Sequence, residues 1–186
     1  MSSLRLHFAS VAGTAIAFIL SLWLNEVIFT HSEFVRGVNW IYLPSGIRLL
    51  STLLLGADGA LGLLVAGLIV DFAYFFPHDP LRAIVGAFIG ASAPYAVYRI
   101  ALERFDLKAS LANLTPRRLL VLACAYSIAS PLLHHLWFAL CGDTQHFAER
   151  FFVMVCGDLA GAIIVLYSAK GLLMLLRPRD KTAQCR

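Results

Sequence analysis

The sequence predicts an all-α membrane protein, a polytopic bundle of about six transmembrane helices. Of its 186 residues, 60% are hydrophobic and only 14% are charged. Apolar stretches of membrane-crossing length recur from one end of the chain to the other, and a soluble domain of this size could not bury them all. We interpret residues 1–176 as a single integral-membrane domain, followed by a basic tail at 177–186.

Hydropathy, with Pro, Gly and charged residues as boundaries, divides the chain into six apolar segments. They are residues 8–30, 40–55, 58–76, 80–103, 118–141 and 148–175. The first continues past twenty residues without a short apolar region followed by a small-residue cleavage site. We therefore interpret it as a retained helix and not as a signal peptide.

The second segment is the shortest. From Leu43 to Leu55, at 1.5 Å per residue, a helix reaches only about 20 Å, against roughly 30 Å of bilayer hydrocarbon. A start at Val38 with a kink at Pro44 makes a full span possible. A re-entrant hairpin is the alternative.

Basic residues indicate which side of the membrane each connection faces. With six crossings and a cytoplasmic N-terminus, the cytoplasmic side holds Arg5, the loop 103–118 and the tail 177–186. The outer side then holds only Arg36, Arg82 and Arg150, on three separate loops. Because basic residues favour the cytoplasmic side, we predict that both termini lie in the cytoplasm.

Two pairs of glycines place small residues one helical turn apart. They are Gly86 and Gly90 in the fourth segment, and Gly157 and Gly161 in the sixth. Such pairs let helix backbones approach closely. We favour packing within the bundle over dimerisation for both pairs.

Polar side chains within the predicted helices gather in one half of the membrane. With odd-numbered helices running outward and even-numbered helices inward, the middle or outer half holds Asn25, Glu26, Arg48, Asp71, His134, His135 and Asp158. An ionised side chain at mid-bilayer costs at least about 2.5 kcal/mol, so such groups face the bundle interior, pair, or contact water. Five helices therefore contribute to one polar region.

Arg48 is the most unusual of these residues, because an arginine cannot lose its proton as a lysine can. We expect a bidentate bridge to Asp71 or Asp158. Such a bridge could serve only to fix the helix register, or Arg48 could form the floor of an outward-facing polar pocket. The acidic groups, with Glu26 included, outnumber this one arginine, which favours a cation, proton or amine site. Glu26 could instead contact lipid headgroups.

The two histidines lie on one helix but point about 100° apart, so both cannot easily face one site. We take His134 as the candidate that faces Asp158, where the two would form a pH-responsive pair. A purely structural role is the alternative for either histidine.

Other kinds of site have weaker support. A metal site could combine His134 or His135 with Cys141, Met154 and Cys156, but these residues lack a recognised ligand spacing. Motifs for hydrolysis and for nucleotide binding are missing from the sequence. We predict no enzymatic activity, no cofactor, no metal and no nucleic-acid partner.

Four stretches together resemble the MASE1 family of bacterial integral-membrane sensory domains. They are "NWIYLPSGIRLLSTLLLG", "GALGLLVAGLIVDF", "RFDLKASLANLTPRRLLVLACAY" and "CGDLAGAIIVL". The residues that match the family's motifs are Trp40, Pro44, Gly46, Gly56, Gly157, Asp158 and Gly161. The resemblance covers residues 38–172 and implies a sensory membrane domain in the bacterial inner membrane.

The sequence also departs from that family. Members usually have Trp-Pro-Pro-x-Gly where this chain has "WIYLPSG", and Arg48 stands at a position expected to be apolar. They usually carry about eight helices and a cytoplasmic kinase, cyclase or phosphodiesterase domain, whereas this chain stops at Arg186. The resemblance therefore implies a sensor that signals through a separate partner.

Our hypothesis is a protein that detects a small polar or cationic ligand from the periplasmic side. The ligand would contact Glu26, Arg48, Asp71, His134 and Asp158. One alternative is the substrate-binding component of a small-molecule uptake system, since such six-helix components resemble this chain in size and topology. Another is a structural subunit of a membrane complex, in which polar residues would face partner helices.

Overall fold

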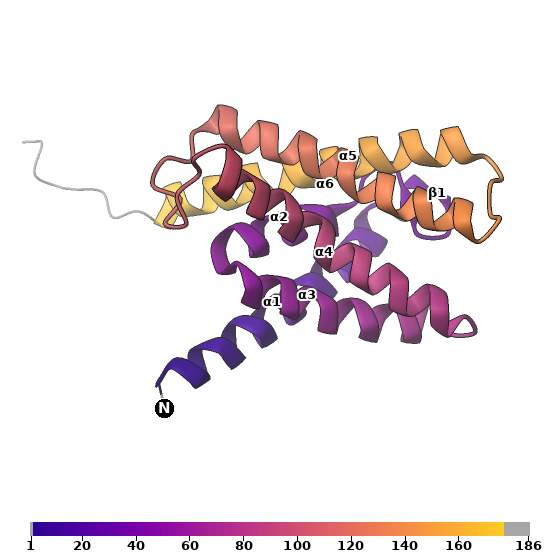
Figure 1. Ribbon diagram of the computed structural model, residues 1–186, viewed down its shortest axis with the longest axis horizontal. Coiled ribbons are helices and arrows are strands. Elements are labelled where there is room, and N and C mark those ends of the chain that lie inside the picture. The colour runs from indigo at the N-terminus through magenta and orange to yellow at the C-terminus, as the bar shows by residue number, and fades with distance from the viewer. Residues whose placement is uncertain (1, 177–186) are drawn as a thin grey trace, which may run out of the picture.

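The structure, a computed structural model, describes residues 2–176 and confirms the all-α fold class. Its helices are α1 (Ser2–Ile28), α2 (Leu43–Leu55), α3 (Ala57–Val70), α4 (Pro80–Arg104), α5 (Pro116–Leu140) and α6 (Phe147–Leu176) (Figure 1). Between α1 and α2 lie the 3-10 turn η1 (Thr30–Ser32) and a hairpin of β1 (Glu33–Val35) and β2 (Val38–Asn39). The π-helical turn η2 (Asp71–Phe75) continues α3.

Five helical stretches are long and apolar enough to cross a membrane. They are Ser3–Ile28, Ala57–Phe75, Pro80–Arg104, Pro116–Leu140 and Phe147–Leu172. Large apolar side chains on these helices, such as Trp23 and Leu136, are exposed on the outside of the bundle. A multi-pass membrane protein follows from these surfaces, because lipid is the solvent that suits them. The tail 177–186 lies outside the described residues.

The first and third helices run parallel. Nδ1 of His7 in α1 lies 2.6 Å from Oδ2 of Asp58 in α3, and at the other end the Tyr74 hydroxyl donates a hydrogen bond to Glu26 at 3.3 Å. Residues 29–56 therefore carry the chain back from one end of the bundle to the other and do not re-enter. We call the end that carries β1 and β2 the hairpin end; α1 begins and α6 ends at the opposite end (Figure 1).

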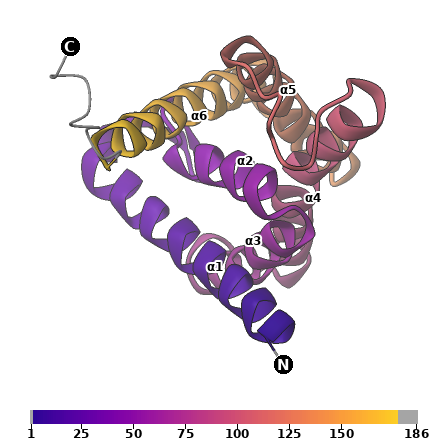
Figure 2. The ribbon, with the colours of Figure 1, turned by 90° about the vertical axis from the view of Figure 1, so that its left-hand side faces the viewer.

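Helix α2 lies inside the bundle and contacts each of the other five helices (Figure 2). It has 13 residues and begins below the hairpin. Its first turn is bonded to both flanking helices: the Leu43 amide donates to Oδ1 of Asn25 at 2.8 Å, and the Ser45 hydroxyl donates to the Asp158 carbonyl at 2.7 Å. The first bond satisfies a backbone amide that the start of a helix leaves without an intrahelical partner, and the second links α2 to α6.

Both glycine pairs pack within the chain, but against different groups. A Cβ at Gly157 or Gly161 would collide with a backbone carbonyl oxygen, that of Asn39 or Tyr42, so α6 holds the irregular strand that leads into α2. In α4, Gly86 and Gly90 leave space for polar side chains, which are described below. The predicted close approach of helix backbones is confirmed at Gly161, since a Cβ at Gly46 of α2 would lie 2.7 Å from the Gly161 carbonyl oxygen. In α4 the partners are side chains and not a helix backbone.

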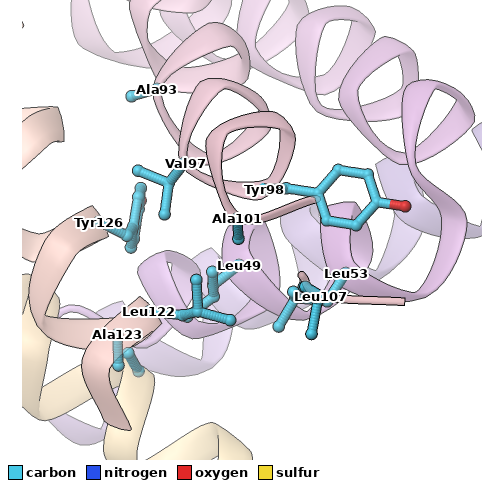
Figure 3. Close-up of a cluster of buried hydrophobic side chains, with 11 residues drawn as sticks. Leu49, Leu53, Ala93, Val97, Tyr98, Ala101, Leu107, Leu122, Ala123 and Tyr126 are labelled. Atoms are coloured by element: carbon cyan, nitrogen blue, oxygen red, sulfur yellow. The ribbon is translucent and has the colours of Figure 1, made fainter. Parts of the chain in front are cut away.

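The main apolar cluster fills the half of the bundle away from the hairpin. Leu49 and Leu53 of α2 pack there against Val97 of α4 and Leu122 of α5, all of them buried (Figure 3). Tyr126 is fully buried in the same cluster. This apolar packing fills the bundle on the side of Arg48 that faces away from the hairpin. A polar cavity beside Arg48 can therefore open only toward the hairpin end.

Cysteine labelling will determine which end faces the outside. Cys141 is exposed and caps α5 at the hairpin end. In spheroplasts of a bacterial host, we expect a membrane-impermeant maleimide to label a variant whose only cysteine is Cys141. A variant whose only cysteine is Cys185, in the predicted cytoplasmic tail, should react only after permeabilisation. The opposite pattern of labelling would overturn the predicted topology.

Candidate functional site

A cavity of about 400 Å³ opens at the hairpin end, between the hairpin, the turn η2 and helices α1, α2, α4, α5 and α6. Its lining is unusually rich in charge for the interior of a membrane bundle. The charged residues that line it are Arg36, Arg48, Asp71, Arg82, Asp143, Arg150 and Asp158. Arginines outnumber carboxylates in this lining, and the aromatic residues Phe18, Tyr42, Trp137 and Phe138 form much of the remaining wall.

Four of the five residues that the sequence singled out line this cavity. Arg48, Asp71, His134 and Asp158 come from α2, η2, α5 and α6. Glu26 does not belong to the lining, and the hydrogen bond from Tyr74 places it beside η2 at the end of α1. The structure therefore brings together groups from four separate elements and leaves Glu26 apart.

The guanidinium of Arg48 is held by aromatic rings. Its Cζ lies 5.0 Å from the ring centroid of Phe18 and 5.6 Å from that of Tyr42, within the range of a cation–π contact. On its other side it packs on α4, where a Cβ at Gly90 would come within 3.0 Å of Nη2. A side chain at position 90 would thus displace Arg48.

The predicted bridge between Arg48 and a carboxylate is not formed. In the part of the chain that the structure describes, no carboxylate oxygen lies within 4.0 Å of the Arg48 guanidinium. The physical reason is that the aromatic rings and the gap above Gly90 hold the guanidinium in another position. Arg48 therefore faces the cavity as a cation supported by rings.

Two carboxylates lie near the floor of the cavity. Asp71 begins the π-helical turn, and its Oδ2 would be 3.1 Å from a Cβ at Gly86, so that glycine leaves room for the carboxylate. Asp158 is only 4% exposed, and its Oδ2 has no hydrogen-bond partner among residues 2–176. The Ser130 hydroxyl interacts with this carboxylate, although the two groups do not form a hydrogen bond of normal geometry. π-Helical turns often occur at functional sites.

The two histidines separate as their spacing predicted. His134 lines the cavity, and its Nδ1 donates to the Ser130 carbonyl at 2.9 Å. His135 points away and is packed among aromatic rings, including Phe147 at 4.9 Å and Phe151 at 5.3 Å between centroids. His134 is therefore the histidine that a ligand in the cavity could contact.

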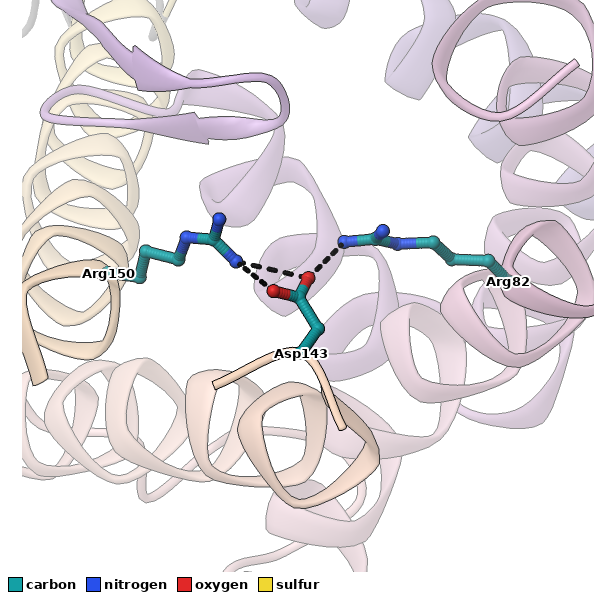
Figure 4. A network of polar contacts seen from close by, with 3 residues as sticks. All are labelled: Arg82, Asp143 and Arg150. Atoms are coloured by element: carbon teal, nitrogen blue, oxygen red, sulfur yellow. Dashed lines mark hydrogen bonds and ion pairs between the residues drawn. The ribbon is translucent and has the colours of Figure 1, made fainter. Parts of the chain in front are cut away.

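Sequence reasoning missed the group that surrounds the mouth of the cavity. Asp143, in the α5–α6 connection, accepts hydrogen bonds from Nη1 of Arg150 at 3.0 and 3.1 Å and from Nη2 of Arg82 at 3.4 Å (Figure 4). Arg36 of the hairpin lies at the same end and donates to the Phe75 carbonyl at 3.3 Å. The available signal was that these three arginines were the exceptions to the positive-inside distribution.

The described residues contain no group of three or more His, Cys, Asp or Glu side chains placed to hold a metal ion. Of the residues considered for a metal site, His134 and Met154 line the cavity. Cys141 is exposed at the end of α5, and Cys156 is not part of the lining.

Neither a family model, nor a curated protein, nor a solved structure matches this chain. The resemblance to the MASE1 family therefore stays a prediction from the sequence, and the functional argument has to come from the cavity itself.

Proposed function

We propose that this chain is a membrane-embedded sensory protein that takes a small polar ligand into the cavity from the hairpin end. The observation that carries the proposal is that Arg48 and Asp158, two ionisable side chains in the bundle interior, line one cavity without an ion pair between them. Such groups are expensive inside a membrane and commonly mark functional sites there.

A purely structural arrangement would predict different geometry. Buried charges that only hold helices together are stable when each is paired and hydrogen-bonded. Here the buried Asp158 has no cation paired with it among residues 2–176, and the neutral Ser130 hydroxyl lies close enough to interact with its carboxylate without forming a hydrogen bond of normal geometry. A ligand with a donor group, such as an amine or a hydroxyl, would supply what the Asp158 carboxylate lacks, and Arg48 would bind an acceptor on the same molecule.

The sequence-based expectation of a cationic ligand rested on carboxylates outnumbering Arg48. The lining of the cavity reverses that excess, because Arg36, Arg82 and Arg150 join it. We therefore propose a polar ligand that carries both a donor and an acceptor. The predicted topology would expose the cavity to the periplasm of a bacterial cell, and a signalling partner would read its occupancy on the cytoplasmic side.

A substrate-binding role in uptake is the second candidate, and the short helix α2 favours it. Membrane transporters often bind their substrates where a discontinuous helix begins inside the bundle. Purification in mild detergent with mass spectrometry of bound proteins separates the two roles. A kinase, cyclase or response regulator supports the sensory role, whereas ATPase subunits support uptake.

A thermal-shift screen tests the proposed site directly. We expect some small amines, amino acids or hydroxy acids to raise the unfolding temperature of the purified protein in detergent by several degrees, because a ligand that binds only the folded state stabilises it. In Asp158→Asn, the same compounds should lose most of this effect, since the charged acceptor is gone.

Asp106→Asn is the matched control. Asp106 is exposed, lies in the α4–α5 connection and has a positive φ of 51°, a conformation that asparagine tolerates. It should respond to the same compounds as the wild type does. An unchanged response in Asp158→Asn would place the ligand elsewhere and remove the basis of the proposal.

A further inference from the structure

The three charged residues at the mouth of the cavity are unequally matched. One carboxylate, that of Asp143, lies between the guanidiniums of Arg82 and Arg150, which come from the first turns of two different helices (Figure 4). The contact therefore holds two cations with a single anion. It joins α4 and α6 through a connection that belongs to neither.

Both arginines also keep hydrogen-bonding capacity that Asp143 does not use. Nε of Arg82 and Nε of Arg150 are buried, and neither has an acceptor among residues 2–176. A buried donor without an acceptor is costly, so it is rare in a purely structural contact. The two arginines have enough donors to bind a group with more acceptor oxygens than one carboxylate has.

The orientation of Arg82 is fixed independently of Asp143. Its Cζ lies 4.8 Å from the ring centroid of Phe76 and 5.0 Å from that of Phe138. Aromatic contacts of this kind hold the planar guanidinium in place and reduce the conformational freedom lost on binding. Arg150 is also well ordered by its surroundings, since its side chain is only 16% exposed.

Planar arginine forks in such an arrangement are suited to oxyanions, which they bind through paired charge-assisted hydrogen bonds. We propose that Arg82 and Arg150 form an oxyanion site at the mouth of the cavity, and that the Asp143 carboxylate occupies this site until a carboxylate or phosphate group displaces it. The inference rests on the proposed function and assigns the acidic end of its ligand.

Displacement would couple binding to the backbone at the hairpin end. Asp143 lies in the short connection 141–146, which contains the positive-φ residues Gly142 and His146. Releasing its side chain removes the tie between this connection and the two helix starts. Occupancy of the site would thus change how α4 and α6 are held together.

An oxyanion bound at the mouth of the cavity could belong to a soluble metabolite or to a lipid headgroup, since both carry carboxylate or phosphate groups. The experiment uses protein in nanodiscs of phosphatidylcholine, with Trp23 and Trp40 replaced by Phe so that Trp137, which lines the cavity, reports binding. Inorganic phosphate and succinate are titrated at constant ionic strength, with chloride as the control anion. A second set of nanodiscs contains phosphatidylglycerol.

The decisive variant is Asp143→Asn, which removes the internal competitor but keeps the size of the side chain. We expect saturable binding of phosphate or succinate that is about tenfold tighter in this variant than in the parent protein. Adding Arg82→Lys or Arg150→Gln should weaken that binding by about tenfold, because each removes a fork donor. If the natural anion is a lipid, phosphatidylglycerol should compete with phosphate in Asp143→Asn.

A structural tie predicts the reverse. In that case Asp143→Asn only lowers thermal stability and gains no affinity for phosphate, succinate or phosphatidylglycerol, which overturns the inference. The two proposals fail separately. If ligands identified through Asp158 ignore Arg82 and Arg150, only the oxyanion site falls. If phosphate or succinate binds Asp143→Asn more tightly while the compounds of the thermal-shift screen stabilise Asp158→Asn as they do the wild type, the oxyanion site stands and the cavity-floor proposal falls.

Discussion

Gly161→Ala should destabilise the protein by about 3 kcal/mol or more, because the added methyl group has no space in this packing. A Cβ at this position would overlap the Tyr42 carbonyl oxygen and would come within 2.8 Å of the Ser45 hydroxyl oxygen. Both belong to the segment that enters α2, and backbone atoms cannot move aside as a flexible side chain can. Unfolding by heat or by denaturing detergent, followed by helical circular dichroism, measures the loss.

Gly171→Ala is the control on the same helix. Gly171 is exposed, and a Cβ there would meet nothing within 4 Å. Alanine should leave stability unchanged or raise it by up to about 1 kcal/mol, because alanine is the better helix former. Equal stability of both variants would show that α6 does not hold the segment before α2 as described.

Arg48→Met should abolish ligand binding, with a loss of 100-fold or more in affinity (about 3 kcal/mol), while leaving the protein folded. Arg48 carries its charge into the bundle without an ion pair to any of residues 2–176, so a side chain of similar length without charge relieves a cost of desolvation. We expect stability to change by less than about 1 kcal/mol, in either direction. Thermal unfolding in detergent and titration with a compound from the screen give the two values.

A structural role for Arg48 predicts a different pair of values. If Arg48→Met unfolds at a much lower temperature and its residual folded fraction binds normally, the arginine serves the packing of α2. Arg99→Met is the matched control, since Arg99 is an exposed arginine whose ion pair is with Glu103 on its own helix. It should resemble the wild type in both measurements.

The positions of the helices could be predicted because the membrane imposes simple rules on sequence. The predicted segments 80–103 and 118–141 lie within two residues of α4 and α5. Proline was one of the boundaries used, and α4 and α5 both begin at a proline. The structure adds a cap to each start: Asp79 accepts from the Arg82 amide at 3.0 Å, and Thr115 accepts from the Arg118 amide at 3.2 Å. Such signals are local, so no tertiary knowledge was needed.

The floor of the cavity could be predicted for a similar reason. A charge in the middle of an apolar helix is conspicuous, and the depths of Arg48, Asp71 and Asp158 already suggested a shared location. The contacts between these three side chains could not be predicted from their depths. The bridge to Arg48 failed because Phe18 and Tyr42, from other elements, provide a competing place for the guanidinium.

The mouth of the cavity could not be predicted, because charges at helix ends are ordinary in a membrane protein. Arg82, Asp143 and Arg150 lie up to 68 positions apart in the sequence and meet only because the helix ends of α4, α5 and α6 converge. In the sequence they read as residues of separate polar loops. Only the tertiary structure shows that the two arginines share the carboxylate of Asp143.

The short helix α2 also has an electrical consequence. Because the cavity reaches Arg48, in the second turn of α2, the insulating part of the bundle is shorter than the roughly 30 Å of bilayer hydrocarbon. The membrane potential then falls over a shorter distance, and the floor of the cavity lies inside that drop. Moving one elementary charge across the whole potential changes its energy by about 2.3 kcal/mol per 100 mV. A charged ligand that reaches Arg48 crosses part of the drop, so its affinity depends on the energised state of the membrane.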